Sequence, residues 1–493
     1  MKNKLLILIT TCTIALNLQA QVQRPKLVVG LVVDQMRWDY LYFYNDEFCE
    51  GGFKRLLAEG YSCENNMINY VPTVTAIGHT SIYTGTTPAL HGIAGNNFYQ
   101  DGKPLYCCGD ETVKPVGSKG KAGLMSPRNM LATTIGDQLR LATNFSSRVF
   151  GVALKDRAAI LPAGHSANAA YWYDKEAGHF ITSTYYMDQL PQWLNQFNQQ
   201  NKTTEDIRAT DQGVTLTFKL AEALIHNEQL GQQPQTDMLC LSISSTDMIG
   251  HATGTRGKEN RSVYLQLDRD LAHFLEVLDQ QVGPGNYLLF LSADHGAVHN
   301  PNYLKQHHLP GAGFPAWEAA KELNKTLAKK YQIHGNIILG TGSNSLYLDH
   351  KLLAKNNLQR QQVISDIRNL LMPDPRIAYV VDRQNVATQS IPQLLRERII
   401  NGTHPKRSGD ILIITTPGVV PGSDKPDYIG TSHGAWNPYD AHIPLIFYGW
   451  HIQHGTTAAT NHITDIAPTI CAMLHIQQPN ACIGQAITTA FEQ

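Results

Sequence analysis

Short and almost uninterrupted runs of hydrophobic residues recur along the chain and predict buried β-strands. Continuous hydrophobicity, without alternation with polar residues, is typical of strands that are covered on both faces, as in a parallel sheet. The predicted strands are Leu27–Val33, Val149–Leu154, Met238–Ile243, Tyr287–Leu291, Ile411–Ile414 and Ile443–Phe447.

Segments with the spacing of amphipathic helices lie between these strands. The alternation of strands and helices predicts an α/β fold, with a mostly parallel, doubly wound sheet and helices on both faces. In such a sheet ligands bind beyond the carboxyl ends of the strands, so we expect the functional residues there. The predicted helices include Leu131–Leu141, Thr215–Ile225 and Val263–Leu278.

Residues 1–20 are predicted to be a secretory signal peptide. Lys2 and Lys4 precede an apolar run that is short for a membrane span, and Ala20 offers a cleavage point before Gln21. An uncleaved membrane anchor is the alternative interpretation. We therefore expect an exported protein, periplasmic or secreted, with no membrane span after removal of the signal.

Residues 21–493 are expected to form one catalytic α/β domain with three insertions. These insertions are predicted near residues 100–130, 171–210 and 316–408. The second contains the polar stretch Asn198–Thr204, which indicates a solvated loop. The third contains two helical patterns and possible strands at Ser345–Leu348 and Ala378–Val381, and is predicted to be a smaller cap or subdomain.

Charge and cysteine content add two constraints. The formal net charge of −1 over 493 residues gives no electrostatic argument for nucleic-acid binding. Of the 8 cysteines, Cys12 lies in the predicted leader, so an odd number remains and at least one thiol lacks an intrachain partner. Cys49 with Cys63, and Cys471 with Cys482, are near enough in sequence to pair.

The segment Val71–Gly85 contains a candidate nucleophile. Pro72 keeps the preceding residue extended, and the following residues can form a helix with Thr75 at its N-cap. A helix N-terminus presents unpaired N–H groups and the positive end of the helix dipole, which suits an anion. The Thr75 hydroxyl is therefore either an ordinary helix cap or a nucleophile, and polar residues elsewhere must decide between these.

Acidic, basic and histidine side chains follow four of the predicted strands. One polar residue at a strand end is ordinary for a turn or a helix cap. Four such positions together indicate a common site at the carboxyl ends of the strands. They are Asp34 after the first strand, Lys155 and Arg157 after the second, Asp247 after the third, and Asp294 with His295 after the fourth.

Aspartate and histidine in this group have the types and spacing of metal ligands. Asp247 and His251 lie one helical turn apart and would share a face. Asp294 and His295 are neighbours that can converge only where the backbone leaves the strand, and Gly296 makes that departure easy.

His433 lies in the glycine-flanked loop GTSHGAW, which is suited to presenting an imidazole. Together with Asp34, the set contains three carboxylates and three histidines, and nitrogen with oxygen ligands suits a pair of zinc ions. Each histidine taken alone is more often a surface or packed core residue. The histidines near the motifs that could be mistaken for ligands are His79, His299, His307, His308 and His442.

Seven motifs occur in a characteristic order: VVDQMRWDY, VPTVTAIGHTS, HGIAGNNFY, LKDRAAILPAGH, SSTDMIGH, SADHG and GTSHGAWN. With these motifs the sequence resembles the alkaline phosphatase superfamily. Within it the chain is similar to the phosphate-irrepressible alkaline phosphatases of the PafA type, which use threonine as nucleophile. The resemblance covers nearly all of the chain after the predicted leader.

The resemblance implies a zinc-dependent phosphate monoester hydrolase that acts on many monoesters through a phosphothreonine at Thr75. It also implies two Zn²⁺ per chain. The implied ligands of one ion are Asp247, His251 and His433, and those of the other are Asp34, Asp294 and His295 with Thr75 in addition. The residues implied to bind the phosphoryl oxygens are Asn96, Lys155 and Arg157.

This set of residues also indicates a substrate charge. A threonine hydroxyl is a weak nucleophile near neutral pH, and coordination to a metal is one way to activate it. Two zinc ions would balance the three carboxylates and a Thr75 alkoxide, which leaves Lys155 and Arg157 to match the dianion of a phosphate monoester. A solvated charged loop is the alternative interpretation of LKDR.

Other functions remain open at this point. A nucleotide pyrophosphatase/phosphodiesterase shares the two-metal, threonine-based design, and a non-catalytic zinc- or phosphate-binding protein is a second alternative. Trapping a phosphorylated Thr75 would separate an enzyme from a binding protein. The expected partners are small-molecule phosphate monoesters and no nucleic acid, and the protein is expected to be a monomer.

Overall fold

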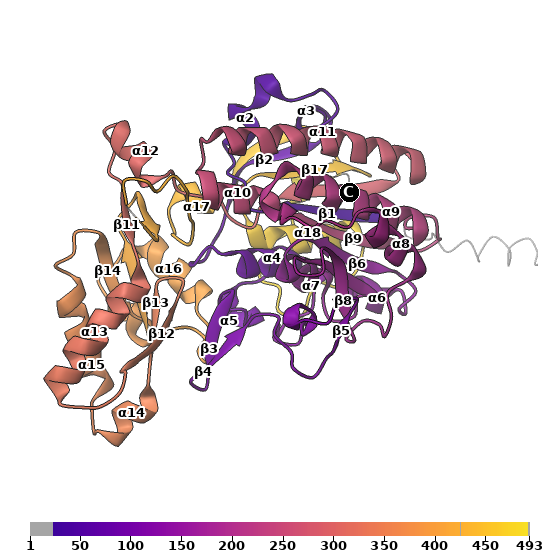
Figure 1. Ribbon diagram of the computed structural model, residues 1–493. Coiled ribbons are helices and arrows are strands. Elements are labelled where there is room, and N and C mark those ends of the chain that lie inside the picture. Colours follow the sequence, from indigo (N-terminus) through magenta and orange to yellow (C-terminus); the bar gives the residue numbers. More distant parts are fainter. Residues whose placement is uncertain (1–22, 424, 492–493) are drawn as a thin grey trace, which may run out of the picture.

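The computed structural model describes residues 23–423 and 425–491, so the predicted signal peptide lies outside the described residues. The main body is built on a ten-stranded sheet with the order β18-β2-β17-β10-β1-β9-β6-β7-β8-β5 (Figure 1). Strands β10, β1, β9, β6 and β7 run parallel to one another. The predicted fold class, a mostly parallel sheet between helices, is confirmed. The strands are β1 Leu27–Val33, β2 Tyr61–Met67, β5 Pro115–Val116, β6 Val149–Ala153, β7 Ala169–Asp174, β8 His179–Ser183, β9 Asp237–Ile243, β10 Tyr287–Ser292, β17 Leu445–Gly449 and β18 Gly455–His462.

The hydrophobic runs predicted where the central strands lie in the sequence. They did not predict the direction of every strand or the sheet to which each strand belongs. Strands β1, β6, β9 and β10 coincide with their predicted ranges to within one residue at each end. Strand β17 runs antiparallel to β10, and β15 (Ile411–Thr415) belongs to a second sheet, so the prediction of parallel main-sheet strands was wrong for both. A continuous hydrophobic run indicates that a strand is buried on both faces, but it does not indicate which strands pair with it or in which direction.

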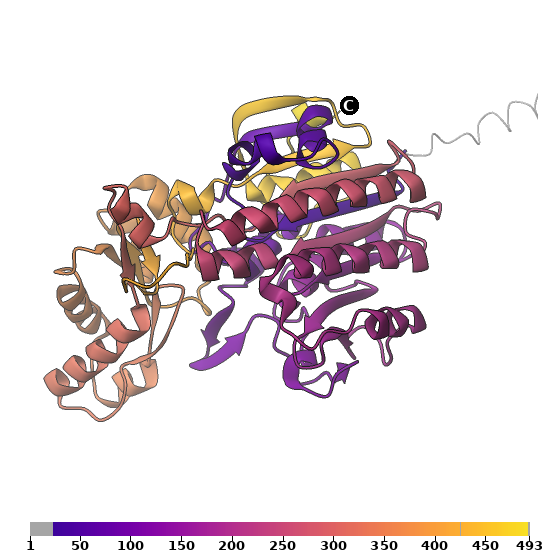
Figure 2. The same ribbon diagram turned by 45° about the horizontal axis from the view of Figure 1, so that its top comes forward.

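Helices cover the sheet in two groups (Figures 1 and 2). Helices α9 (Asp211–Asn227), α10 (Ser245–Thr253) and α11 (Lys258–Gln281) pack on one another, and α4 (Thr75–Thr84) contacts α6 (Ile135–Ala142), α7 (Asp156–Ala163) and α18 (Ile466–Met473). The three predicted helices correspond to α6, α9 and α11. Helix α6 begins later than predicted because Thr134 forms a capping box with Asp137. The remaining helices of the main body are α2 Tyr40–Phe43, α3 Phe53–Glu59, α5 Pro88–His91, α8 Gln192–Gln200 and α17 Pro438–Ala441, while α12 (Pro301–Gln306) lies on the side of the smaller unit.

A smaller unit stands beside the main body, in orange at the left of Figure 1. Its four-stranded sheet has the order β12-β13-β15-β14 and its own buried hydrophobic core. Because β15 follows residue 408, this sheet includes a strand beyond the end of the third predicted insertion. The predicted limits of the catalytic domain and its insertions stay a prediction. Its elements are β12 Ile338–Gly342, β13 Ser345–Leu348, β14 Ile377–Asp382, α13 Ala316–Tyr331, α14 His350–Lys355, α15 Arg360–Leu371 and α16 Gln393–Gly402.

Two small sheets and a shared cluster connect the parts of the chain. Strands β3 (Asn97–Gln100) and β4 (Lys103–Tyr106) form a hairpin, and β11 (Ala312–Phe314) pairs with β16 (Val419–Pro421). A hydrophobic cluster joins α16 and the small sheet to Val71, which precedes the candidate nucleophile. The smaller unit therefore packs against the segment that precedes Thr75 and stabilises its position.

The segment of residues 171–210 is more ordered than the sequence predicts. Strands β7 and β8 join the main sheet, and α8 covers the first part of the stretch predicted as a solvated loop. Asn198 is buried, and its side-chain amide exchanges two hydrogen bonds with the backbone of Phe180. The solvated-loop prediction was wrong at Asn198 because a strand backbone satisfies its polar side chain.

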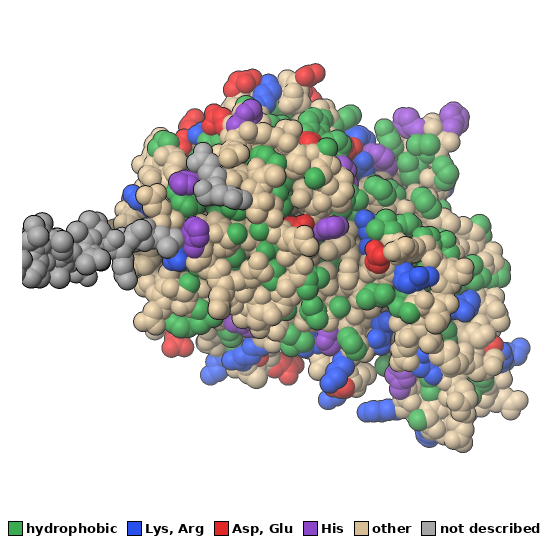
Figure 3. Space-filling model, turned by 180° about the vertical axis from the view of Figure 1, so that it is seen from behind, with side chains coloured by type: hydrophobic (Ala, Val, Ile, Leu, Met, Phe, Trp, Pro, Cys, Tyr) green, Lys and Arg blue, Asp and Glu red, His purple; other side chains and the backbone are tan. Residues whose placement is uncertain are grey.

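All seven cysteines of the described residues are free, so the pairs Cys49–Cys63 and Cys471–Cys482 are not bonded. Most are buried, and burial raises the pKa of the Cys63 thiol to about 12. Within residues 23–423 and 425–491, no helix combines the length and apolar character needed to cross a bilayer. On the face shown in Figure 3, charged side chains of both signs are interspersed with hydrophobic and neutral ones.

Candidate functional site

Neighbouring strands of the main sheet deliver the predicted site residues to one edge. Asp34 directly follows β1, Lys155 lies just beyond β6, Asp247 lies in the first turn of α10 after β9, and Asp294 lies two residues beyond β10. The loop before α17 brings His433 to the same place. The expectation that the polar residues meet at the carboxyl ends of the strands agrees with this arrangement.

Thr75 is the first residue of α4, and Val74 is the N-cap. The prediction of Thr75 as the N-cap was therefore wrong by one position, because Val74 keeps the extended backbone. No side-chain capping bond occupies the Thr75 hydroxyl, and the residue is 1% exposed. Its Oγ1 lies 3.5 Å from His295 Nε2, and the neighbouring Ala76 N–H donates to Asn96 Oδ1 at 2.9 Å. Asn96 thus lies beside the start of the helix.

The three predicted histidine ligands share one hydrogen-bond arrangement. In each, Nδ1–H donates to a backbone carbonyl: His251 to Thr431 (2.9 Å), His295 to Gly296 (2.9 Å) and His433 to Thr73 (2.7 Å). This bond fixes the tautomer and leaves the lone pair of Nε2 available. The same arrangement is typical of histidines that bind a metal.

The ligand atoms of the predicted residues converge into two overlapping groups. Those of Asp34, Asp294 and His295 lie within 4.8 Å of one another, and so do those of Asp247, His295 and His433. The rings of His295 and His433 stack with centroids 3.5 Å apart. His295 therefore lies between the two groups.

His251 approaches the site from the rim. Its Nε2 lies 3.1 Å from Asp247 Oδ1, and its side chain is 41% exposed. The structure thus brings all six predicted ligands together.

Unsatisfied buried oxygens show that these residues fit a metal centre. Asp34 Oδ1 and Asp294 Oδ2 are buried and accept no hydrogen bond within the protein, which is costly for a carboxylate. Burial and then the Asp294 carboxylate raise the pKa of Asp34 well above its ordinary value. Burial and then the His295 imidazole lower the pKa of His433, so that this ring is neutral, as a ligand must be. Divalent cations with oxygen and nitrogen ligands would relieve these costs.

The two bases of the LKDR motif have different surroundings. The Lys155 ammonium lies 2.6 Å from Asp34 Oδ2 and 2.5 Å from Asp247 Oδ2. Burial lowers the pKa of Lys155, but Asp247 and Asp34 outweigh it and the net shift is upward. Arg157 lies 3.3 Å from the Tyr106 hydroxyl, and its buried Nε has no hydrogen-bond partner. Lys155 is thus bound to the carboxylates, whereas Arg157 keeps a free donor.

Gln35 is a site residue that sequence reasoning missed. Its backbone N–H donates to Asp294 Oδ1 at 3.1 Å, and its side-chain amide donates to Asp247 Oδ1 at 2.5 Å. Its φ of 65° lies in the left-handed region, where a residue other than glycine is uncommon. The only sequence feature that could have indicated a role for Gln35 was its position next to Asp34. That position does not predict its hydrogen bonds to Asp247 and Asp294, which are distant in the sequence.

His79 and Asp440 support the site from behind. His79 Nδ1 lies 2.9 Å from the Thr75 carbonyl and 3.3 Å from Asp294 Oδ2. Asp440 Oδ2 accepts the N–H groups of Gly434 (2.9 Å) and Ala435 (2.7 Å), which holds the loop of His433. Burial raises the pKa of Asp440 to about 7, and the two backbone donors oppose this shift. Among the described residues, His299, His307, His308 and His442 belong to neither of the two candidate metal-binding groups.

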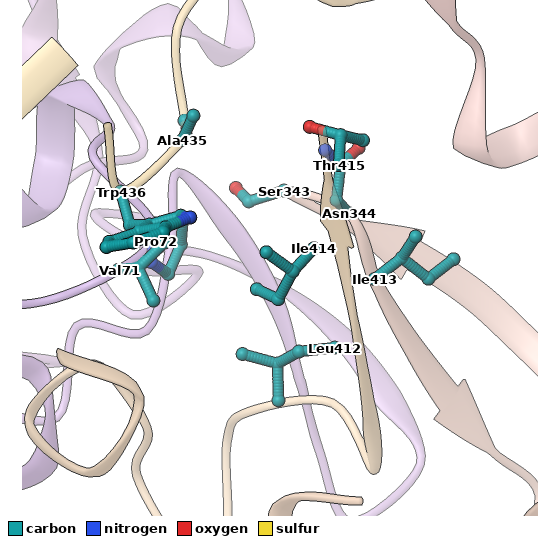
Figure 4. A pocket seen from close by; sticks show the side chains of 11 residues that line it. Val71, Pro72, Ser343, Asn344, Leu412, Ile413, Ile414, Thr415, Ala435 and Trp436 are labelled. Atoms are coloured by element: carbon teal, nitrogen blue, oxygen red, sulfur yellow. The ribbon is translucent and has the colours of Figure 1, made fainter. Parts of the chain in front are cut away.

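A small cavity lies between the His433 loop and the smaller unit. Figure 4 shows the Trp436 ring against Pro72, with Ile414 of the small sheet on the other side. The cavity measures about 20 Å³, which is enough for about one water molecule. It lies where the two units pack together and offers no room for a substrate group.

Comparison with known proteins places the chain among phosphate-ester hydrolases. The family model described as type I phosphodiesterase / nucleotide pyrophosphatase matches residues 28–436. A protein of Myroides odoratus named calcium-transporting ATPase is 46% identical, over 96% of this chain and 96% of its own length. Alkaline phosphatase PafA of Elizabethkingia meningoseptica is 45% identical, over 95% of this chain and 94% of its own. The crystal structure of wild-type alkaline phosphatase PafA superposes with a TM-score of 0.92 at 45% identity, covering 96% of this chain and 100% of that one.

Proposed function

The chain belongs to the type I phosphodiesterase / nucleotide pyrophosphatase family, within the alkaline phosphatase superfamily, and from this membership we propose how its site acts. It is an alkaline phosphatase, a hydrolase of phosphate monoesters. The observation that supports this most strongly is the match to PafA over nearly the whole chain, in sequence and in structure. The transport name of the Myroides relative has no such structural counterpart among the matches described above.

We propose that the site holds two Zn²⁺ ions. Asp247, His251 and His433 would hold one ion, and Asp34, Asp294 and His295 the other, with Thr75 as a further ligand. When bound, zinc supplies Lewis acidity to the reacting hydroxyl and to the phosphate ester. The free Nε2 atoms and the unsatisfied carboxylate oxygens support this proposal.

Thr75 is the proposed nucleophile. Its Oγ1 loses a proton and forms a bond to phosphorus, and the bond between phosphorus and the ester oxygen breaks, so that the alcohol departs and a phosphothreonine remains. The proton lost by Thr75 is balanced by the one that the departing alkoxide takes up to become the alcohol. Water then attacks the phosphorus, the bond between phosphorus and Thr75 Oγ1 breaks, inorganic phosphate departs, and a proton from the water restores the hydroxyl. The start of α4 supports this role because the hydroxyl makes no capping bond and lies at the positive end of the helix dipole.

Asn96, Lys155 and Arg157 are proposed to bind the phosphoryl oxygens. Asn96 uses its carbonyl on the Ala76 N–H, which leaves its amide N–H groups for a substrate oxygen. Arg157 has an unpaired Nε donor, and Lys155 adds a positive charge beside the carboxylates. Two cationic groups match the dianion of a monoester better than the single charge of a diester.

We further propose that residues 1–20 direct export to the periplasm or medium, and that the protein acts as a monomer on a broad range of monoesters. The charged and apolar pattern of the leader supports export. The broad range is an extension of the resemblance to PafA-type enzymes.

Replacement of the two bases tests the proposed substrate recognition. In Lys155→Ala and Arg157→Ala, kcat/KM for p-nitrophenyl phosphate should fall by roughly 10- to 100-fold, because each removes a charge-assisted hydrogen bond. The loss for bis(p-nitrophenyl) phosphate should be far smaller. Steady-state kinetics on both substrates measures this, with Lys258→Ala as the control, since that side chain is 91% exposed. Equal losses on monoester and diester would contradict charge matching and favour the phosphodiesterase alternative.

A further inference from the structure

A cleft of about 280 Å³ opens next to the proposed phosphoryl site. Lys155 and Arg157 line it, so it is continuous with the groups proposed to bind the reacting phosphoryl group. Three further basic side chains line it as well: Lys121, Lys175 and Arg208. The cleft is large enough for a substituent of the substrate, unlike the cavity beside Trp436.

Two of these basic groups are not neutralised by the protein. Lys121 and Lys175 are exposed, and within the described part of the chain neither has a carboxylate at ion-pair distance. Arg208 is held by Asp206 through hydrogen bonds of 2.8 Å and 2.6 Å. Asp206 also attracts Lys175 electrostatically but lies beyond ion-pair distance, so the two lysines supply the positive charge of the rim that no ion pair among the described residues holds.

Two acidic side chains of the cleft accept hydrogen bonds from hydroxyl groups, which orient the carboxylates but leave their negative charge in place. Asp156 accepts the Tyr106 hydroxyl at 2.5 Å, and buried Asp174 accepts the Ser118 hydroxyl at 2.5 Å. Glu176, which is exposed, is the remaining acid at the rim. Five basic side chains line the cleft against these three acids, so the balance of charge favours an anion.

The wall of the cleft has few free polar groups. Trp172 uses its indole N–H on the carbonyl of Ala122 at 2.9 Å, and the Tyr173 hydroxyl pairs with Thr203. A ligand group that enters the cleft therefore meets the lysine ammonium groups as its main donors. Ammonium groups act as point charges and suit a phosphoryl group.

We propose that this cleft binds a second phosphoryl group of the substrate, so that the enzyme prefers small molecules with two phosphate monoesters. This inference rests on the proposed function, because the first phosphoryl group must occupy the site of Arg157 and Lys155. The second group would gain two charge-assisted contacts that a simple monoester lacks. Sugar bisphosphates and nucleoside bisphosphates share this chemistry.

Kinetics with the full-length, zinc-loaded enzyme tests the proposal in two pairs of substrates. The pairs are fructose 1,6-bisphosphate with fructose 6-phosphate, and adenosine 3′,5′-bisphosphate with AMP, and they separate a sugar from a nucleoside as the source of the second group. In at least one pair, the wild type should have a kcat/KM for the bisphosphate about tenfold higher than that for the monophosphate, mainly because KM is lower for the bisphosphate. The double variant Lys121→Ala/Lys175→Ala should lower this ratio of the two kcat/KM values to about one.

Two further variants sharpen the test. Glu176→Gln removes the opposing charge at the rim and should raise the ratio. Lys202→Ala removes a charge from an exposed lysine that does not line the cleft and should leave the ratio unchanged. Opposite effects of the Glu176 and lysine variants would exclude a general loss of folding.

Several results would overturn the inference. A wild-type ratio of about one in both pairs would do so, as would a double variant that lowers bisphosphate and monophosphate hydrolysis alike. If Lys202→Ala lowered the ratio as much as the double variant does, the inference would also be contradicted. The preference for bisphosphates would then come from the positive charge of the surface in general and not from binding in this cleft. If the wild type failed to hydrolyse p-nitrophenyl phosphate at all, the proposed function itself would fail, which is a separate and recognisable outcome.

Discussion

His91 is a buried histidine outside the site, and it makes the stability of the fold depend on pH. Its Nδ1 accepts the N–H of Ile93 at 3.1 Å, and its Nε2 lies 3.2 Å from the Ser81 hydroxyl. Burial, followed by the charges of His404 and Arg407, lowers its pKa from 6.5 to about 3. The folded protein therefore keeps this ring neutral, whereas the unfolded chain takes up a proton below about pH 6.5.

The stability that depends on neutral His91 is present above pH 6.5 and is lost as the pH falls toward 3. Between pH 7.5 and pH 5 we expect a loss of about 2 kcal/mol from this residue. His91→Gln, which cannot take up a proton, should lack this part of the loss. Urea unfolding of both proteins at the two pH values measures it, and the difference between them cancels the other titrating groups. An identical pH dependence in both proteins would show that His91 does not titrate as its burial requires.

Individual ligands were predictable where the residue type itself defines the chemistry. Asp34, Asp247, Asp294 and His295 follow strands of the main sheet, His251 lies one turn after Asp247 in α10 and His433 lies in a glycine-flanked loop, and the structure gathers all six at one place. Gln35 and Asp440 act through hydrogen bonds to residues distant in sequence, and neither glutamine nor aspartate at those positions reveals its partner. The roles of the gathered residues stay predictions until the variants are measured.

Helix α4 packs directly on the segment that carries Asp294, and a glycine makes this approach possible. A Cβ at Gly78 would lie 2.2 Å from the Asp294 carbonyl oxygen and 2.6 Å from its Cα. Gly78→Ala must therefore separate Thr75 from Asp294, and overpacking of this kind costs about 1–3 kcal/mol of stability. We expect kcat for p-nitrophenyl phosphate to fall at least about tenfold, because a small misplacement of reacting groups is expensive.

The control for this prediction is Gly455→Ala, where a Cβ would meet only the Tyr61 ring at an ordinary distance of 3.5 Å. Circular dichroism and thermal unfolding establish whether both variants are folded. A Gly78→Ala enzyme with unchanged kcat would mean that the close approach of α4 to the Asp294 segment is unnecessary for activity.

Elements were predictable from the sequence when local pattern alone determined them. The strand Leu27–Val33 was predicted residue for residue because all of its side chains are buried, and the periodicity of α11 is sustained over many turns. The antiparallel direction of β17 and the membership of β15 in the second sheet depend on pairing with distant strands. Pairing of that kind is a tertiary property, which a local hydrophobic pattern does not contain.

Metal removal tests the proposed site at the scale of the whole molecule. The six proposed ligands lie between residues 34 and 433, so bound ions would join segments from nearly the full length of the chain. The free energy of unfolding should then include the binding energy of the ions: about 4 kcal/mol for one site at a thousandfold excess of free zinc over its dissociation constant. Dialysis against a chelator should abolish hydrolysis of p-nitrophenyl phosphate and lower the Tm by several degrees.

Zinc added back should restore both activity and Tm, whereas Mg²⁺ should not, since histidine ligands favour zinc over magnesium. In His433→Ala the rise of Tm on zinc addition should be smaller than in the wild type, because one of the ions loses a ligand. Calorimetry measures this independently of turnover, so a binding defect can be separated from a catalytic one. Full activity in demonstrably metal-free protein would refute the metal-dependent mechanism. A Tm that does not respond to zinc would instead show that groups of the protein balance the negative charge of the buried carboxylates. The main such group would be Lys155, whose ammonium contacts the carboxylates of Asp34 and Asp247.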